Sequence, residues 1–265
     1  MMFYDFEYDG MLLSDFGYIV CTFGDSGSDT ISNGSEITFN TVPVRNGDKQ
    51  ERISTEYKST IETTICICKN VCDPNTDFSM SVQEIREMMR WLNRKEYLPF
   101  RIMTDDMIDV WFSASFNVNR VEINGETAGL ELHMQTNRPY ATNGVKTTVL
   151  KFLEANGEKS VVNLSDDHGA LYPKAKIECH ASGNLSLYNA LDDRVTYIAN
   201  VSDGEVITMD DPVITTSLSS HAIQEDFNWN FLRLVSSYRE NINKITASLP
   251  CTVTLVYEPI VKIGI

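Results

Sequence analysis

The sequence predicts a mainly β protein with two domains, the first of which contains one α-helix. Three observations support this fold class. Apolar residues recur strongly at helical spacing in only one segment, residues 81–94, whereas most other segments alternate apolar and polar residues over short runs. Turn signals separate those runs at close intervals. The length of 265 residues also exceeds that of a usual single domain.

The helix is predicted to begin at Ser81. Ser81 and Glu84 have the spacing of a capping box, in which the two side chains satisfy backbone N–H groups of the first helical turn. Pro99 prevents the helix from continuing that far. The apolar residues at helical spacing are Val82, Ile85, Met88, Met89 and Leu92, with Trp91 beside them. We therefore expect one face of this helix to be buried.

Strands joined by tight turns are predicted on both sides of the helix. The clearest turn signals in this half are Asp9–Gly10, Asn46–Gly47–Asp48 and Asn124–Gly125. The runs 36–44 and 54–70 flank the second turn and are expected to be strands, and residues 24–35 are expected to form a polar loop. The expected sheet is antiparallel, with the helix covering one face or end.

The second half contains almost no helical signal. From Val145 onward, many short alternating runs follow one another with turns such as Gly183–Asn184 between them. This pattern is typical of a β-sandwich or jelly roll. Proline and glycine in residues 137–144 favour a boundary there, and we expect domains at residues 1–143 and 144–265.

Composition argues against two classes of function. The formal net charge of −15 does not suit a dedicated DNA or RNA binder, because such proteins neutralise phosphates with clustered lysine and arginine. No run reaches the eighteen or so apolar residues that a membrane-crossing helix needs, so we expect no membrane insertion. The first ten residues also lack the basic and apolar regions of a secretion signal.

No motif for catalysis or for a cofactor is present. The four histidines are scattered, and the sequence contains no H-E-x-x-H, G-x-S-x-G, phosphate-binding or dinucleotide-binding pattern, so we predict no enzyme, no metal and no cofactor. Cys66, Cys68 and Cys72 do not have zinc-site spacing, and we interpret the cysteines as free thiols. A metal-binding turn at Asp166–His168 remains an alternative, for which calcium is the best guess among metals.

The three tryptophans raise a choice between packing and binding. We expect Trp91 and Trp111 to pack the helix against the sheet, so that replacing Trp111 with alanine would cost about 3–5 kcal/mol. Trp229 is a candidate glycan-stacking residue, since aromatic side chains form such platforms. The same parity of Phe227, Trp229 and Phe231 favours instead an inward-facing aromatic strand.

The order of several phrases resembles the distal tail protein family of long non-contractile-tailed bacteriophages and related prophage tail components. Each phrase is weak alone, but together they span essentially the whole chain. In the first half they are YDG (8–10), LLSDFG (12–17), REMMRWLNRKEYLPFRI (86–102) and MIDVWFSASF (107–116). In the second half they are ALYPKAKIECHASGNLSLYNA (170–190), SDGEVITMDD (202–211), EDFNWNFLRL (225–234) and SLPCTVTLVYEP (248–259).

The resemblance implies a structural virion protein rather than an enzyme. Such proteins form a hexameric ring at the phage tail tip or baseplate, which joins the tail tube to the tip or receptor-binding apparatus and leaves a central channel for DNA. Their first domain is a β-sandwich-like fold with a helix and a hairpin arm that reaches the neighbouring subunit. Their second domain is a galectin-like or carbohydrate-module-like jelly roll.

For this chain, the resemblance implies the following partners: further copies of itself, the tail tube protein, and a tail-associated lysin, tail fibre or receptor-binding protein. DNA would be only a passing cargo, and the protein would be made in the host cytoplasm. The candidate arm residues are Val44, Arg45, Asn46, Gly47 and Asp48. Two alternatives remain open: a carbohydrate-binding module that contacts the host wall through the second domain, and a hydrolase with an unrecognised site.

Overall fold

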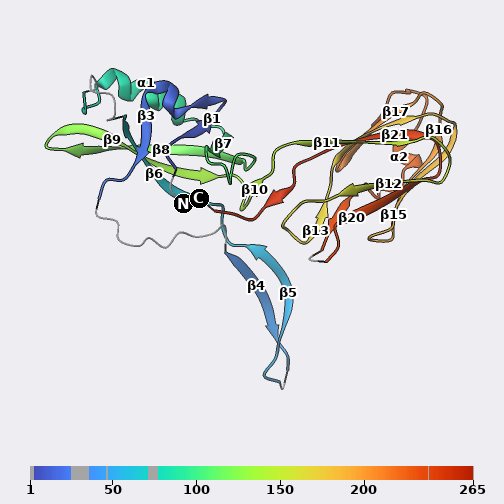
Figure 1. Ribbon diagram of the computed structural model, residues 1–265. Helices are drawn as coiled ribbons and strands as arrows, with labels where there is room; N and C mark the ends of the chain where they lie inside the picture. Colours follow the sequence, from blue (N-terminus) through green and yellow to red (C-terminus); the bar gives the residue numbers. More distant parts are fainter. Residues whose placement is uncertain (1–2, 25–35, 46, 71–76, 238, 265) are drawn as a thin grey trace. The chain divides into compact units, whose positions relative to one another are not determined.

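The computed structural model describes residues 3–24, 36–45, 47–70, 77–237 and 239–264, and its fold is mainly β, as predicted (Figure 1). The chain divides into two compact units, Met1–Thr142 with Lys262–Ile265, and Asn143–Val261. Within the described segments, every helix is too short or too polar to cross a membrane.

The first unit is built on a seven-stranded antiparallel sheet with the order β2-β1-β7-β8-β9-β6-β3. The N–H of Val20 in the edge strand β3 donates to the carbonyl of Tyr4, just before β1, at 3.0 Å, so the sheet curls until its far ends approach each other. The strands are β1 (Phe6–Tyr8), β2 (Met11–Leu12), β3 (Tyr18–Cys21), β6 (Glu62–Lys69), β7 (Leu98–Ile102), β8 (Phe112–Ile123) and β9 (Glu126–Thr136). The unit also contains a 3-10 helix, η1 (Leu13–Phe16), and a short strand, β10 (Ala141–Thr142).

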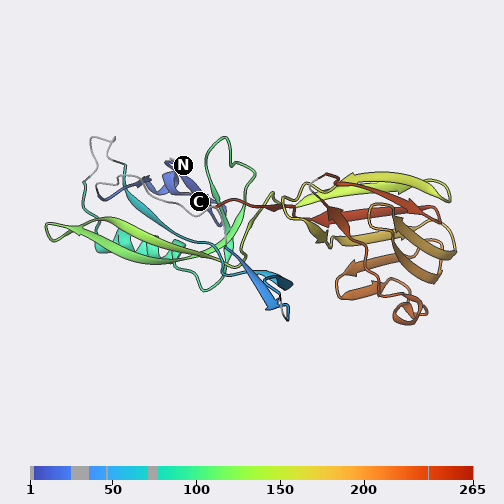
Figure 2. The same cartoon turned by 90° about the horizontal axis from the view of Figure 1, so that it is seen from below.

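Helix α1 (Val82–Leu92) covers one face of this sheet (Figure 2). Its N-cap is Ser81, whose hydroxyl accepts from the Glu84 N–H at 3.3 Å while the Glu84 carboxylate accepts from the Ser81 N–H at 2.7 Å, which confirms the predicted capping box. Ile85, Met88, Trp91 and Leu92 are buried. The apolar stripe in the sequence is thus the face that packs on the sheet.

An aromatic cluster joins α1 to the strands. The Trp91 ring stacks on Phe16 at 4.5 Å and on Phe6 at 5.8 Å, and its Nε1–H donates to the Tyr8 carbonyl at 3.1 Å. Trp111 was expected in the same place, and that prediction is wrong. Side chains alternate along a strand, so Trp111 lies on the opposite face from the buried neighbour Phe112.

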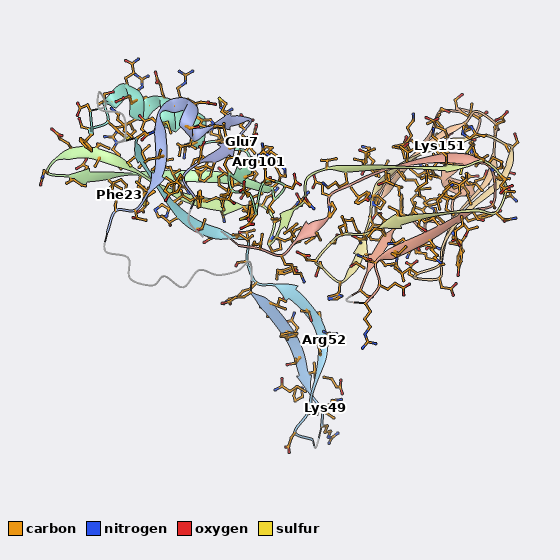
Figure 3. The ribbon with its side chains drawn as sticks, viewed as in Figure 1. Glu7, Phe23, Lys49, Arg52, Arg101 and Lys151 are labelled. Atoms are coloured by element: carbon orange, nitrogen blue, oxygen red, sulfur yellow. The ribbon has the colours of Figure 1, made fainter. Side chains whose placement is uncertain are left out.

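Trp111 instead packs against a half-buried ion pair. The Arg101 guanidinium lies 4.4 Å from the centre of the Trp111 ring and binds Glu7 Oε2 through Nε at 2.8 Å and Nη2 at 2.5 Å. Figure 3 shows Glu7 and Arg101 side by side on neighbouring strands. This contact ties β1 to β7 and leaves the indole only partly buried.

Two predicted turns have the backbone that their sequences require. Asp9 and Gly10 both have positive φ between β1 and β2, as do Asn124 and Gly125 between β8 and β9. This is the type I′ geometry of two-residue hairpins.

Gly129 has a different role: a Cβ there would lie 2.3 Å from the Ile67 carbonyl oxygen and 2.4 Å from the Phe23 ring, so only glycine fits beneath that ring.

The run 54–70 was expected to be one strand, and the structure divides it. Residues up to Tyr57 belong to β5 (Gln50–Tyr57), which pairs with β4 (Ile37–Pro43) in a separate two-stranded sheet. Residues from Glu62 belong to β6 of the large sheet. The chain leaves one sheet for the other across residues 58–61, where Ile61 turns into the core.

The second unit is an antiparallel β-sandwich, as predicted. Its sheets have the orders β11-β21-β14-β17-β18 and β12-β20-β15-β16, and their inward side chains form one continuous core. The first sheet contains β11 (Lys146–Phe152), β14 (Lys174–Cys179), β17 (Val206–Asp210), β18 (Val213–Thr216) and β21 (Cys251–Tyr257). The second contains β12 (Gly157–Val162), β15 (Gly183–Asn189), β16 (Arg194–Val201) and β20 (Ile242–Ala247). The remaining elements are β13 (Gly169–Leu171), β19 (Leu234–Ser236), β22 (Ile260–Val261) and α2 (Ile223–Asp226).

Candidate subunit interface

The predicted arm is the hairpin of β4 and β5, and its tip contains the candidate residues. Val44, Arg45, Gly47 and Asp48 lie between the two strands, and Asn46 falls outside the described residues. The Val44 N–H donates to the Lys49 carbonyl at 3.0 Å, and the Gly47 N–H donates to the Val44 carbonyl at 3.1 Å. These bonds close the hairpin and leave the side chains of the described tip residues exposed.

The hairpin has one apolar and one polar face near its base. Ile37 pairs with Tyr57 and Phe39 with Thr55, so these four side chains share one face. The opposite face has Thr38, Asn40, Ser54 and Glu56. The Asn40 Nδ2–H₂ group donates to Ser54 Oγ and to Glu56 Oε1, both at 2.9 Å, which satisfies the polar face internally.

The apolar face is left largely uncovered. Phe39 is 61% exposed, and Ile53, the extra residue in a bulge opposite Asn40 and Thr41, is 71% exposed. On this face, Tyr57 is partly covered at the base, where its ring lies 6.1 Å from that of Tyr140 and 5.9 Å from the Lys262 ammonium. A two-stranded hairpin is marginally stable in water, and a cluster of exposed apolar side chains on one is typical of a surface that another chain covers.

Charged side chains line the hairpin edges. Lys49 binds Glu51 at 2.6 Å near the tip, and Lys58 binds Glu36 at 2.7 Å near the base. The hydrogen bond and charge of Lys58 lower the pKa of Glu36. Figure 3 shows Lys49 and Arg52 projecting from the outer part of the hairpin. Exposed pairs of this kind contribute little stability, but they keep an uncovered strand edge from pairing at random.

Sequence reasoning named the tip of the hairpin and did not name its strand side chains. Ile37, Phe39, Val42 and Ile53 are the exposed apolar residues of β4 and β5. The alternation of Ile37, Phe39 and Thr41 was the available signal. This alternation is equally typical of a strand in a buried sheet, because a sequence does not say whether the chain itself covers an apolar face.

Trp229 is exposed, so the preference for core packing was wrong for this residue. Phe227 and Phe231 are buried as expected, but Trp229 has φ +58° and 53% exposure. The Asn228 side chain is the cause: its carbonyl accepts from the Tyr197 and Asn230 N–H groups, both at 3.1 Å, and its Nδ2–H₂ group donates to the Val195 carbonyl at 2.9 Å. These bonds twist the segment out of strand geometry along the edge of β16.

The residues considered as metal ligands do not come together in a site in the described structure. Cys66 and Cys68 lie along β6 as half-buried free thiols, and Cys72 falls outside the described residues. In the described part of the chain, no three His, Cys, Asp or Glu side chains are close enough together to hold a metal ion.

Comparison with known proteins gives the family. A profile described as "Phage tail protein N-terminal domain" matches residues 1–138, and one described as "Phage tail C-terminal domain" matches residues 140–257. The chain therefore belongs to this phage tail protein family, a family of structural tail components that interact with other tail proteins in the virion. A comparison with curated proteins gave no significant match.

The fold is similar to that of a solved distal tail protein. The crystal structure of Dit (gp 19.1) of phage SPP1, described as "a Paradigm of Hub Adsorption Apparatus in Gram-positive Infecting Phages", superposes with a TM-score of 0.66 and 13% sequence identity. The match covers 97% of this chain and 99% of the SPP1 chain. The predicted resemblance to distal tail proteins is confirmed at the level of the fold.

Proposed function

We propose that this tail protein is the distal tail hub. In this proposal, six copies form a ring at the tail tip or baseplate, join the tail tube protein to a tail-associated lysin, tail fibre or receptor-binding protein, and leave a channel for DNA. The protein is made in the host cytoplasm and acts mechanically rather than as an enzyme. Residues 1–143 form the ring, and residues 144–265 form the galectin-like outer domain.

The observation that supports this proposal best is the uncovered apolar face of the β4–β5 hairpin. Phe39 and Ile53 are more than half exposed, yet the hairpin's polar face is internally hydrogen-bonded. A second copy of the chain is the occupant that repeats this contact around a ring, because each subunit offers one hairpin and receives another. The net charge of −15 also suits a channel through which DNA slides without sticking.

Light scattering at several concentrations tests the ring. We expect a mass near six times the 29.9 kDa chain, or a two-ring multiple. Phe39→Ser should shift the population to monomer. Leu153→Ser is the matched control, because Leu153 is 88% exposed on the other unit and should not affect assembly. A chain that stays monomeric alone and with purified tail tube protein would contradict the proposal.

A second candidate function rests on Trp229. Its ring is exposed beside β16, where Val195 and Tyr197 are exposed as well, and an aromatic surface of this kind can stack on sugar rings. In this alternative, the second unit is a carbohydrate-binding module that contacts the host wall. Trp229→Ala should then abolish pull-down by purified wall polysaccharide, whereas Leu153→Ala should not. Equal binding by both variants and the parent would exclude this site.

A further inference from the structure

Two cysteines face each other across neighbouring strands of the second unit. Cys179 is the last residue of β14, Cys251 is the first residue of β21, and the antiparallel register pairs them directly. Both belong to the core between the two sheets, and both are free thiols. Because directly paired residues share a face of the sheet, the two sulfur atoms point into the same part of the core.

The backbone hydrogen bonds show which kind of pair this is. The Cys179 N–H donates to the Glu205 carbonyl and the Cys179 carbonyl accepts from the Gly204 N–H, both at 2.9 Å, so both groups point away from β21. The His180 N–H then donates to the Pro250 carbonyl at 3.0 Å. Cys179 and Cys251 thus occupy a non-hydrogen-bonded position, where Cα atoms are about 4.5 Å apart and side chains are closest. A disulfide requires a Cα separation of about 4.4–6.8 Å.

We propose that Cys179 and Cys251 form a cross-strand disulfide when the protein meets an oxidising environment. Both Sγ–H bonds break, one Sγ–Sγ bond forms, and two electrons and two protons pass to the oxidant. With oxidised glutathione, one thiolate attacks the glutathione disulfide and releases one glutathione, and the other thiolate then attacks the mixed disulfide and releases the second. The family places this chain in a phage tail, and virion surfaces are among the places where protein disulfides persist.

Burial delays this reaction until the strand ends open. Burial, together with the charges of Glu205 and Asp203, raises the pKa of Cys179 to about 11. Burial and the neighbouring Cys179 raise the pKa of Cys251 to about 12. The thiolate is the attacking species, so the closed pair reacts slowly. Both cysteines lie at strand ends, where opening costs less free energy than in the middle of a sheet.

The bond would link residues that are distant along the chain. Strands β15 to β20 lie between Cys179 and Cys251, so the disulfide would restrict most of the second unit in the unfolded state. Links that close long loops remove the most conformational entropy from the unfolded chain. The oxidised protein is therefore expected to be more resistant to heat than the reduced protein.

Refolding in glutathione buffers tests the proposal on the full chain. The unfolded protein is refolded at increasing ratios of oxidised to reduced glutathione, its free thiols are alkylated, and peptides are mapped without reduction. We expect one peptide pair linked through Cys179 and Cys251, and a thermal midpoint higher by about 5 °C or more than that of the reduced chain. Refolding makes both thiols accessible, so slow reaction of the closed pair does not affect the result.

Variants separate this pair from the other cysteines. Cys179→Ala and Cys251→Ala should each abolish the linked peptide and the rise of the thermal midpoint. Cys68→Ala, a matched control in the first unit, should retain both. A natively refolded parent chain with both thiols alkylated at the most oxidising ratio would overturn the proposal. A linked chain with an unchanged or lower thermal midpoint would confirm the bond and overturn the expected stabilisation of the unit.

Discussion

Two hairpins of the first unit, β8–β9 and β4–β5, have opposite environments. In β8–β9, the buried residues of each strand alternate with polar ones, and Phe116 contacts the aromatic cluster that includes Phe6. In β4–β5, the same alternation leaves Phe39 exposed. This hairpin pairs with no further strand in the described structure. The first hairpin completes the fold of its own chain, whereas the second has an apolar face that the described part of the chain does not cover.

Strand pattern and burial are separate properties in these two hairpins. Alternation of apolar and polar residues specifies which side chains share a face, but a face becomes buried only when another layer covers it. Helix α1 supplies that layer for the β8 strand of β8–β9. For β4–β5 we propose that a neighbouring subunit supplies it. Substitutions in the two regions should therefore differ: those in the first should change stability, and those in the second should change association.

The largest stability effect is expected at Trp91. Trp91→Ala removes a ring that is 5% exposed and stacks on Phe6 and Phe16, and it also removes the donor to the Tyr8 carbonyl. We expect a loss of about 3–5 kcal/mol in the free energy of unfolding. Trp111→Ala should cost less, because Trp111 is only partly buried under Arg101. Denaturant unfolding of both variants measures the order, and equal losses would contradict this account of the two faces.

The next effect separates two glycines, one in each hairpin. Gly129→Ala places a methyl group 2.3 Å from the backbone oxygen of Ile67, which cannot move without disturbing β6. We expect a loss of about 3 kcal/mol, at the upper end of ordinary overpacking. Gly47→Ala at the tip of β4–β5 meets no atom closer than 3.9 Å and should leave stability almost unchanged. Thermal unfolding of the pair is the measurement, and a Gly129→Ala protein as stable as the parent would contradict the close approach of the Ile67 carbonyl oxygen.

Much of this fold follows from the sequence for physical reasons. The Ser81–Glu84 box is a local interaction, and the turns at Asp9–Gly10 and Asn124–Gly125 use residues that tolerate positive φ. Such signals depend on a few adjacent residues, so a single sequence is enough to find them. The mainly β class and the sandwich of the second unit follow in the same way from repeated short alternation.

The sequence predictions that were wrong share one cause: contacts between residues distant in the sequence determine the structure there. The run 54–70 looks continuous, but Ile61 turns into the core and moves the chain from one sheet to another. Trp229 has the parity of an inward residue, but Asn228 binds β16 and reverses it. The short helix α2 was not predicted either. The candidate interface was located only as a turn, because the exposure of Phe39 depends on long-range packing, and the described part of the chain leaves its side chain uncovered.

A buried ionic cluster in the second unit should give stability that depends on pH. His221 Nδ1 lies 2.6 Å from Glu205 Oε1, and its Nε2 lies 3.2 Å from Asp226 Oδ2. Burial alone would lower the pKa of His221, but the two carboxylates outweigh it and raise that pKa. Burial alone would raise the pKa of Glu205, but hydrogen bonds from Thr216, His221 and the Ser202 N–H outweigh it and lower that pKa.

The directions of the two pKa shifts define the pH range in which this cluster stabilises the fold. The contribution of His221 is complete below its unfolded pKa of about 6.5 and is lost as pH rises through its higher folded pKa. The contribution of Glu205 is present above its unfolded pKa of about 4.3 and is lost as pH falls through its lower folded pKa. His221→Gln should therefore be most destabilising between about pH 4.5 and 6.5, and the difference from the parent should shrink at alkaline pH.

Thermal midpoints measured across this range test the cluster. The matched control is Glu51→Gln, which removes an exposed ion pair with Lys49 on the β4–β5 hairpin and should leave the pH profile nearly unchanged. A His221→Gln profile parallel to that of the parent would contradict the assigned shifts.

A smaller effect is expected at the start of α1. Ser81→Ala removes the hydroxyl that accepts from the Glu84 N–H and binds the Glu84 carboxylate at 2.7 Å. We expect a loss of about 1 kcal/mol, the usual value for an N-cap. Ser113→Ala, a strand position outside the cap, is the control. Urea unfolding measures both variants, and a loss no larger than that of the control would mean that the cap contributes nothing.

The smallest stability effect and the largest association effect should coincide on the β4–β5 hairpin. Phe39→Ala changes a side chain that is 61% exposed and that no layer of the described structure covers, so the free energy of unfolding of the monomer should change by no more than about 0.5 kcal/mol. The same variant should lose the oligomer. Thr38→Ala, on the opposite polar face, should alter neither property. Denaturation below the concentration of assembly, combined with light scattering above it, separates the two properties. A Phe39→Ala monomer as destabilised as Trp91→Ala would mean that the hairpin packs on its own chain, and the contrast between the two hairpins would then be lost.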